Sequence, residues 1–241
     1  MILEESTWKD AQKAFTRTKL AIIPIGAVEC HGSHNPMGIE SYVVTELARR
    51  IEKQIDVIVA PTIPVSYSRA WGEFPGTLWV TPATLKAYLL DICRCLIGYG
   101  TRYLLFLNGH GPNVPTVEEI YQEVTEQSVQ CAQIDLWRFI GNQSQDLGES
   151  QVPLGHSGEL ATSVMMALAE ELVQKSQMGI ATSQPTPTAA FPDVVAYYPS
   201  SSATPQAFVG DPSKATVSKG KTILTRCTSR LIEFIQQWTT I

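Results

Sequence analysis

Short apolar runs alternate with longer amphipathic segments along the chain. Four of the short runs end near a turn and are predicted as strands, over residues 20–25, 56–60, 103–107 and 131–136. The segments between them carry apolar residues at helical spacing. Such an alternation is typical of a parallel sheet covered by helices.

The longer segments predict helices. In the first of them Val43, Val44, Leu47 and Ile51 fall on one face. Thr81 followed by Pro82 is a typical helix start, and Gly220 is a weak point inside the last helix. The predicted helices cover residues 41–53, 82–96, 115–129, 158–172 and 215–238.

The stretch from 176 to 212 differs in composition, because Pro, Ser, Thr and Ala dominate it. We predict a long irregular excursion there. Phe191, Tyr197 and Tyr198 favour a packed loop or a subunit contact over free disorder. The 241 residues suit one large domain, so 1–241 is expected to fold as a single unit.

Charge narrows the classes of partner. The chain has 18 basic and 23 acidic residues and no basic cluster, which argues against nucleic acid. Its start is polar, and no apolar run approaches the ~20 residues needed to span a bilayer. We therefore expect a cytoplasmic protein without a membrane partner. The odd count of 5 cysteines favours reduced, mostly buried thiols.

All four histidines lie in polar turns that contain glycine. His31 and His34 follow the first predicted strand, His110 follows the third, and His156 precedes a predicted helix. A lone histidine is usually a structural residue. The carboxyl ends of parallel strands lie along one edge of a sheet, however, so turns after different strands can converge on one ligand. Four histidines so placed indicate a site.

Carboxylates accompany these histidines. Glu29, Glu40 and Glu159 lie close to them in sequence or at the head of a helix. Imidazole with carboxylate suits Zn²⁺ or Mn²⁺, whereas Ca²⁺ prefers oxygen alone. Up to four imidazoles and three carboxylates are enough for two divalent ions. The chain has no G-x-S-x-G, GxxxxGK[ST] or GxGxxG motif, which disfavours the corresponding hydrolase and nucleotide-binding classes.

Five segments together resemble the creatininase (creatinine amidohydrolase) family, nearly from end to end. They are PIGAVECHGSH at 24–34, FPGT at 74–77, NGHGPN at 108–113, GHSGELATS at 155–163, and a closing segment formed by Gly210 and residues 215–220. The resemblance implies a three-layer α/β/α sandwich around a mainly parallel sheet. It also implies assembly as a homo-oligomer, specifically a hexamer.

The resemblance further implies residue roles. The ligands of a binuclear centre would be Glu29, His31, Glu40, His110 and Glu159. His156 would be the catalytic proton carrier. Four further residues would bind the substrate or support the metal ligands: His34, Trp71, Asn108 and Trp137. For Trp71 and Trp137, a place in the hydrophobic core is about equally common. Cys30 stands where the family usually has Gln, as a small filler, a soft ligand or a redox switch. Glu40 stands where the family usually has Asp.

The implied reaction is hydrolysis of a non-peptide C–N bond, in a cyclic amide or a formamide, by a hydroxide held between two metal ions. Creatinine itself is not expected, because Pro112, Val152 and Gly155 depart from the creatininase pattern. Two alternatives stay open. One is a metal-binding or assembly protein without turnover. The other is a deformylase acting on a formylamino-pyrimidine, or a peptide-trimming enzyme of cofactor maturation.

Overall fold

A four-stranded parallel sheet forms the centre of the computed structural model, which describes residues 1–125, 128–185, 191, 193–194 and 199–240. The strands are β1 (Leu20–Ile25), β2 (Ile58–Val59), β3 (Tyr103–Asn108) and β4 (Gln130–Asp135). Their order across the sheet is β2-β1-β3-β4. β1 and β3 pair along their full length, so that Ile25 lies beside Asn108 at their carboxyl ends.

The side chains of each central strand alternate between two buried clusters. Leu20 and Ile22 of β1 face one cluster, whereas Ala21, Ile23 and Ile25 face the other. β1 is buried at every position and β3 at all but its first. A sheet covered on both faces accounts for these continuous apolar runs, which period-two patterning would not produce.

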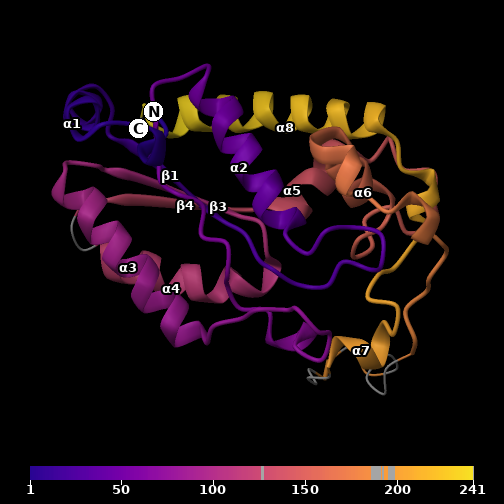
Figure 1. Ribbon diagram of the computed structural model, residues 1–241. Helices are drawn as coiled ribbons and strands as arrows, with labels where there is room; N and C mark the ends of the chain where they lie inside the picture. The colour runs from indigo at the N-terminus through magenta and orange to yellow at the C-terminus, as the bar shows by residue number, and fades with distance from the viewer. Residues whose placement is uncertain (126–127, 186–190, 192, 195–198, 241) are drawn as a thin grey trace.

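Helices cover both faces (Figure 1). One face is covered by α2 (Ile39–Glu52), α5 (Leu136–Gln143), α6 (Glu159–Ala169) and α8 (Val217–Trp238). The other is covered by α1 (Trp8–Arg17), α3 (Pro82–Gly98) and α4 (Val114–Thr125). The predicted three-layer α/β/α sandwich with a parallel sheet is confirmed.

Several helix ends follow local chemistry. Thr81 caps α3, since its hydroxyl accepts from the N–H of Thr84 at 3.2 Å, and Thr216 caps α8 by accepting from Lys219 at the same distance. Three helices were not expected from the sequence: α1, α5 and the short α7 (Ser200–Ala203). β4 ends at Asp135, and Leu136, predicted as strand, begins α5.

The predicted excursion at 176–212 is irregular where the structure describes it, apart from α7 (Ser200–Ala203) and single 3-10 turns at its two ends. Ala181 and Gly210 exchange two backbone hydrogen bonds, and Phe208 is buried against His34. Phe191 is exposed, whereas Tyr197 and Tyr198 lie outside the described residues.

The chain leaves β1 toward β2 on one side and returns to β3 on the other. The loops after β1 and β3 therefore separate at a topological switch point, where open α/β sheets form their ligand crevice. At this point the N–H of Gly109 donates to the carbonyl of Ile25 at 2.7 Å. The loops that carry the predicted histidines start from this edge.

Candidate metal centre

Glu29 is the residue around which the site is arranged. It lies in the loop after β1, where its N–H donates to the carbonyl of Met37 at 3.0 Å and its side chain is 1% exposed. One carboxylate oxygen lies 3.8 Å from Nε2 of His31, and the other lies 3.4 Å from Nε2 of His110. Glu29 thus lies between an imidazole of its own loop and one from the loop after β3.

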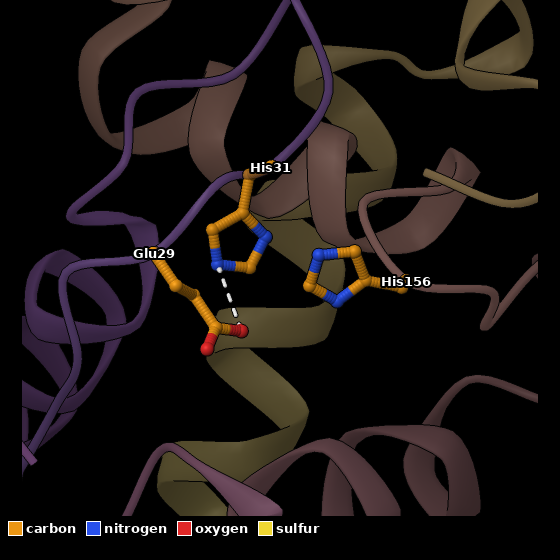
Figure 2. A group of neighbouring side chains, drawn as sticks. All are labelled: Glu29, His31 and His156. Atoms are coloured by element: carbon orange, nitrogen blue, oxygen red, sulfur yellow. Dashed lines mark ion pairs between the residues drawn. The ribbon is translucent and has the colours of Figure 1, made fainter. Parts of the chain in front are cut away.

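Two groups of possible ligands share this carboxylate. The first contains Glu29, His31 and His156, and the second contains Glu29, Glu40 and His110. Within each group the ligand atoms lie within 4.8 Å of one another. Figure 2 shows the first group, with the imidazoles of His31 and His156 side by side and close to the Glu29 carboxylate.

Glu40 reaches the site from the first turn of α2. Both of its carboxylate oxygens lie 3.2 Å from Nδ1 of His110. Nε2 of His110 lies 2.9 Å from the carbonyl of Tyr67 and 3.3 Å from the hydroxyl of Ser68. A Nε2–H donated to that carbonyl leaves Nδ1 as the ligand atom, an arrangement common for metal-binding histidine. Tyr67 and Ser68 carried no motif, so sequence reasoning missed this support.

Buried polar atoms without partners test whether metal ions fit here. Oε2 of Glu29, both ring nitrogens of His31 and Oε2 of Glu40 are buried without a hydrogen bond. Leaving such atoms unpaired is costly, and most buried polar atoms in proteins are satisfied. These four atoms are carboxylate oxygens or imidazole nitrogens, the donors that Zn²⁺ and Mn²⁺ take. The residues therefore fit divalent metal ions.

The pKa values in this cluster reflect burial and the closeness of the charged groups. Burial and the neighbouring Glu40 raise the pKa of Glu29 to about 8. Burial alone would lower the pKa of His110, but Glu40 and Glu29 outweigh it and raise that pKa to about 9. Burial and the other histidines lower the pKa of His31 far below its ordinary value. Such shifts are typical of functional sites.

His156 is fixed on three sides. Its ring stacks on His31 with centroids 4.5 Å apart, and on Trp71 with centroids 4.1 Å apart. Nε2 lies 2.9 Å from the carbonyl of Cys30, so a proton on Nε2 leaves Nδ1 free. Burial lowers the pKa of His156, which keeps the ring neutral at pH 7. Trp71 contacts the ring of the predicted proton carrier.

A cavity of about 180 Å³ adjoins these residues. Its polar walls include His31, Glu40 and His156, and its apolar walls include Leu154 and Trp137. The indole N–H of Trp137 donates to Oε1 of Glu40 at 3.2 Å. Trp137, which α5 places here, thus both lines the cavity and holds a candidate ligand.

A larger groove of about 840 Å³ lies between α1 and α3, away from this centre. Its walls are mainly apolar, and the described residues that line it include no histidine. By size alone, that groove would be the candidate functional site. The clustered ligand atoms and shifted pKa values instead indicate that the functional site is at the smaller cavity.

His34 lies behind the site. Its Nε2 is 3.0 Å from the carbonyl of Ser157 and 3.2 Å from the hydroxyl of Thr162, and its ring meets Phe208 edge-on. Asn35 donates to both the Ser157 and Thr162 hydroxyls. The Ser157 hydroxyl in turn donates to the carbonyl of His31 at 2.9 Å. This network ties the loop after β1 to the loop that carries His156.

Asn108 shapes the turn that presents His110. Its side-chain oxygen accepts from the N–H of His110 and from the side chain of Asn113, each at 3.1 Å. Asn113 also accepts from the N–H of Tyr67 at 3.1 Å, so it joins two loops. Asn108 was expected to bind substrate or to support ligands, and its contacts with His110 and Asn113 support a ligand.

Glu159 differs from expectation, because the structure does not bring it into either group of ligands. Its carboxylate is fully buried and accepts from the N–H groups of Glu149 and Ser150. Nζ of Lys219 lies 2.6 Å from its Oε1. Burial would raise the pKa of Glu159, but Lys219 and Ser150 outweigh it, so the pKa lies below its ordinary value. A carboxylate so engaged has other partners than a metal ion.

Cys30 is buried and belongs to neither group of possible ligands among the described residues. Burial and the charge of Glu29 raise its pKa to about 12. The thiol of the metal-free protein therefore stays protonated at neutral pH, whereas redox reactions require the thiolate. These features favour the filler reading.

Comparison with known proteins bears on this geometry. The family profile described as "Creatininase: Creatinine amidohydrolase" matches residues 4–235. The chain belongs to the creatininase family. It is 27% identical over 253 residues to creatinine amidohydrolase of Pseudomonas putida, covering 97% of this chain and 95% of that protein. It is 25% identical over 235 residues to mycofactocin precursor peptide peptidase of Mycolicibacterium smegmatis, covering 91% and 85%.

Solved creatininases share the fold. A structure described as "Creatininase Mn" superimposes with a TM-score of 0.82 at 23% identity, covering 98% of this chain and 97% of the other. A creatininase variant of Zn-Zn type gives a TM-score of 0.81 at 25% identity over the same shares. In the described part of the chain, no helix is long and apolar enough to cross a membrane.

Proposed function

We propose that this protein is a metal-dependent amidohydrolase that cleaves a non-peptide C–N bond in a small amide. The observation that carries the proposal is the shared carboxylate of Glu29, which lies between two groups of buried, unpartnered ligand atoms beside a small cavity. Family membership supports the reaction class.

Two divalent ions would be held by these side chains, one by Glu29, His31 and His156 or by part of that set, and one by Glu29, Glu40 and His110. When bound, such ions activate water as a nucleophile near neutral pH and polarise a substrate carbonyl. His110 is oriented for this role by Tyr67, and Glu40 by Trp137. Zn²⁺ or Mn²⁺ fits the donors.

His156 is suited to move a proton. It is neutral at pH 7, and the Cys30 carbonyl fixes its tautomer so that Nδ1 is free to accept. If His156 does not itself hold metal, it would take a proton during attack on the carbonyl and return it to the leaving nitrogen. The His156 ring stacks on His31 and on Trp71, and these two contacts keep it from turning.

The cavity favours a small substrate. Its volume of about 180 Å³ is below the 300–1,000 Å³ common for drug-sized ligands. Leu154, Ala161 and the Trp137 ring give it apolar walls. A cyclic amide or a formamide fits such a space, and the substrate need not be creatinine.

A second candidate is the trimming of a peptide, which is favoured by the 25% identity to the mycofactocin precursor peptide peptidase. The same site chemistry would serve both reactions. The two candidates differ in whether the end of a peptide can enter the site. A panel of substrates tests this directly.

The test combines metal analysis with turnover. Purified protein should contain one to two divalent ions per chain, and Glu29→Gln should lose most of them, because both ligand groups share that carboxylate. Glu233→Gln, an exposed carboxylate far along α8, is the matched control and should retain metal.

A panel of cyclic amides, formamides and short peptides is then assayed for ammonia, formate, ring-opened acid or a new amine. Metal-dependent release from a small amide supports the proposal. Release from peptides alone favours the second candidate. A protein with under about 0.3 ion per chain that Glu29→Gln leaves unchanged would overturn the metal centre.

A further inference from the structure

The fully buried carboxylate of Glu159 is not used by the proposed reaction, yet it is densely bonded. Its Oε2 accepts from the N–H groups of Glu149 and Ser150 at 3.0 and 2.7 Å. Its Oε1 contacts Nζ of Lys219 at 2.6 Å. Lys219 also reaches Oε1 of Glu149 at 2.5 Å and the carbonyl of Lys214 at 3.0 Å.

These bonds join three separate segments. Glu159 is the first residue of α6, Lys219 lies in the first turn of α8, and Glu149 and Ser150 belong to the loop between α5 and α6. A carboxylate is favoured at a helix N-terminus, but a cation there is disfavoured by the helix dipole. The contacts of Lys219 with two carboxylates and a carbonyl oxygen offset this unfavourable effect.

The loop held by this contact leads directly into the site. Residues 149–158 fold back on the start of α6, where Leu160 donates to the carbonyl of Pro153 at 3.0 Å and Gly158 donates to the carbonyl of Gly155 at 2.8 Å. Leu154 and Gly155 of this loop line the cavity, and the next residue is His156. The loop has no regular secondary structure of its own, so its shape depends on these anchors.

We propose that Glu159 and Lys219 form a buried ionic latch that positions the 149–156 loop, and through it the cavity wall and His156, and that Glu159 is not a metal ligand. The inference about catalysis rests on the proposed function. The inferences about the loop and about metal binding do not rest on the proposed function, because loop order and metal content can both be measured without a substrate.

The test uses Lys219→Met, Glu159→Gln and the double variant, with Lys221→Met, exposed on the same helix, as control. Lys219→Met leaves the buried carboxylate without its cation, which costs more than removing both charges. We expect amide exchange at Glu149 and Ser150 to rise at least about tenfold in Lys219→Met and to return toward wild type in the double variant. Metal content should stay at the wild-type level in all variants.

The position of His156 has its own readout. Because the chain has only 4 histidines, ¹⁵N-histidine labelling gives a simple spectrum, in which the His156 signals are assigned by their loss in His156→Asn. In Lys219→Met these ring signals should shift or broaden, and they should recover in the double variant. Lys221→Met should leave them unchanged.

With an active substrate, Lys219→Met should lower kcat by about tenfold at a temperature where it is fully folded, and the double variant should restore most of it. A latch that only stabilised the fold would leave kcat unchanged there. Glu159→Gln that loses metal would show Glu159 to be a ligand. Unchanged exchange and His156 signals in Lys219→Met would overturn the latch, whereas a wild type without turnover would overturn only the proposed function.

Discussion

At the scale of single residues, the site is distinguished by buried polar atoms that have no hydrogen bond. Oε2 of Glu29, the His31 ring nitrogens and Oε2 of Glu40 are buried without a hydrogen bond. His110 is held by Tyr67, and Glu40 by Trp137. Carboxylate oxygens and imidazole nitrogens can donate lone pairs to the same divalent cation, so this arrangement suits metal binding.

Trp137→Phe tests the support of Glu40. The change keeps an aromatic wall but removes the N–H that donates to Oε1 of Glu40. We expect the affinity for divalent metal to fall about tenfold, as is usual when a group behind a ligand is lost. Competition with a chromogenic chelator measures it. Trp71→Phe is the matched control, since Trp71 contributes ring stacking alone, and equal affinities in both variants would contradict the prediction.

The thiol of Cys30 offers a second residue-scale prediction. With its pKa raised to about 12 by burial and Glu29, only about one molecule in ten thousand carries the thiolate at pH 8. Iodoacetamide should therefore modify exposed Cys95 at least about a hundredfold faster than Cys30, as measured by peptide mass spectrometry. Metal removal should leave the Cys30 rate low. A large increase on chelation would instead show Cys30 to be a soft ligand.

At the scale of elements, α6 and α8 approach each other closely enough for their backbones to touch. A Cβ at Gly220 of α8 would lie 1.9 Å from the carbonyl oxygen of Ser163 in α6. The hydroxyl of Ser163 also accepts from the N–H of Thr216 at 3.1 Å. From the sequence Gly220 is a weak point of a helix, but in the structure it is where two backbones meet.

Gly220→Ala weighs these two effects against each other. Alanine would add about 1 kcal/mol of helix propensity, but overpacking costs about 1–3 kcal/mol, and here the obstacle is backbone that cannot rotate away. We expect a net loss in the free energy of unfolding, measured by urea denaturation. Gly98→Ala, where a Cβ meets nothing within 4 Å, should be neutral or slightly stabilising. The reverse order would contradict the packing argument.

The elements were predictable to the extent that local pattern determines them. β1 was predicted to the residue because all six of its positions are buried and apolar. α5 was missed because its Leu136 continues the apolar run of β4, and α1 because its mostly polar sequence buries only Ala14 and Phe15. Glu29, His31, Glu40 and His110 could be grouped because each follows a strand or starts a helix at one sheet edge. The partners of Glu159 could not, since Lys219 is 60 residues away in sequence.

At the scale of the whole molecule, the switch point between β1 and β3 brings four buried ionisable groups together: Glu29, His31, Glu40 and His110. Burial and the neighbouring Glu40 disfavour the charged form of Glu29, whereas the two carboxylates favour the charged form of His110, so the metal-free protein holds protons on both groups. Glu29, with its pKa raised to about 8, and His110, with its pKa raised to about 9, both keep protons longer in the folded state than in the unfolded chain. Folding, proton binding and metal binding are therefore linked.

The sign of this linkage gives a prediction for stability. A raised pKa in the folded state contributes stability that is complete below the unfolded pKa, about 4.3 for Glu and 6.5 for His, and is lost as pH rises through the folded pKa. Burial lowers the pKa of His31 and His156, and that contribution is complete once the pH passes their unfolded pKa near 6.5. Chelator-treated protein should thus lose stability from pH 7 to pH 9, as Glu29 and His110 release their protons. One kcal/mol moves the Tm by about 2–4 °C for a chain of this size, so scanning calorimetry resolves the trend.

Metal should remove that trend, because bound cations replace the same protons and bind more tightly as pH rises. The Tm difference between metal-saturated and chelator-treated protein should therefore widen from pH 7 to pH 9. In Glu29→Gln the widening should shrink, whereas Glu233→Gln should behave like wild type. A Tm difference that stays constant with pH would mean that the ligands enter the metal-free fold already deprotonated, contrary to the crowding of Glu29, Glu40 and His110 in one buried cluster.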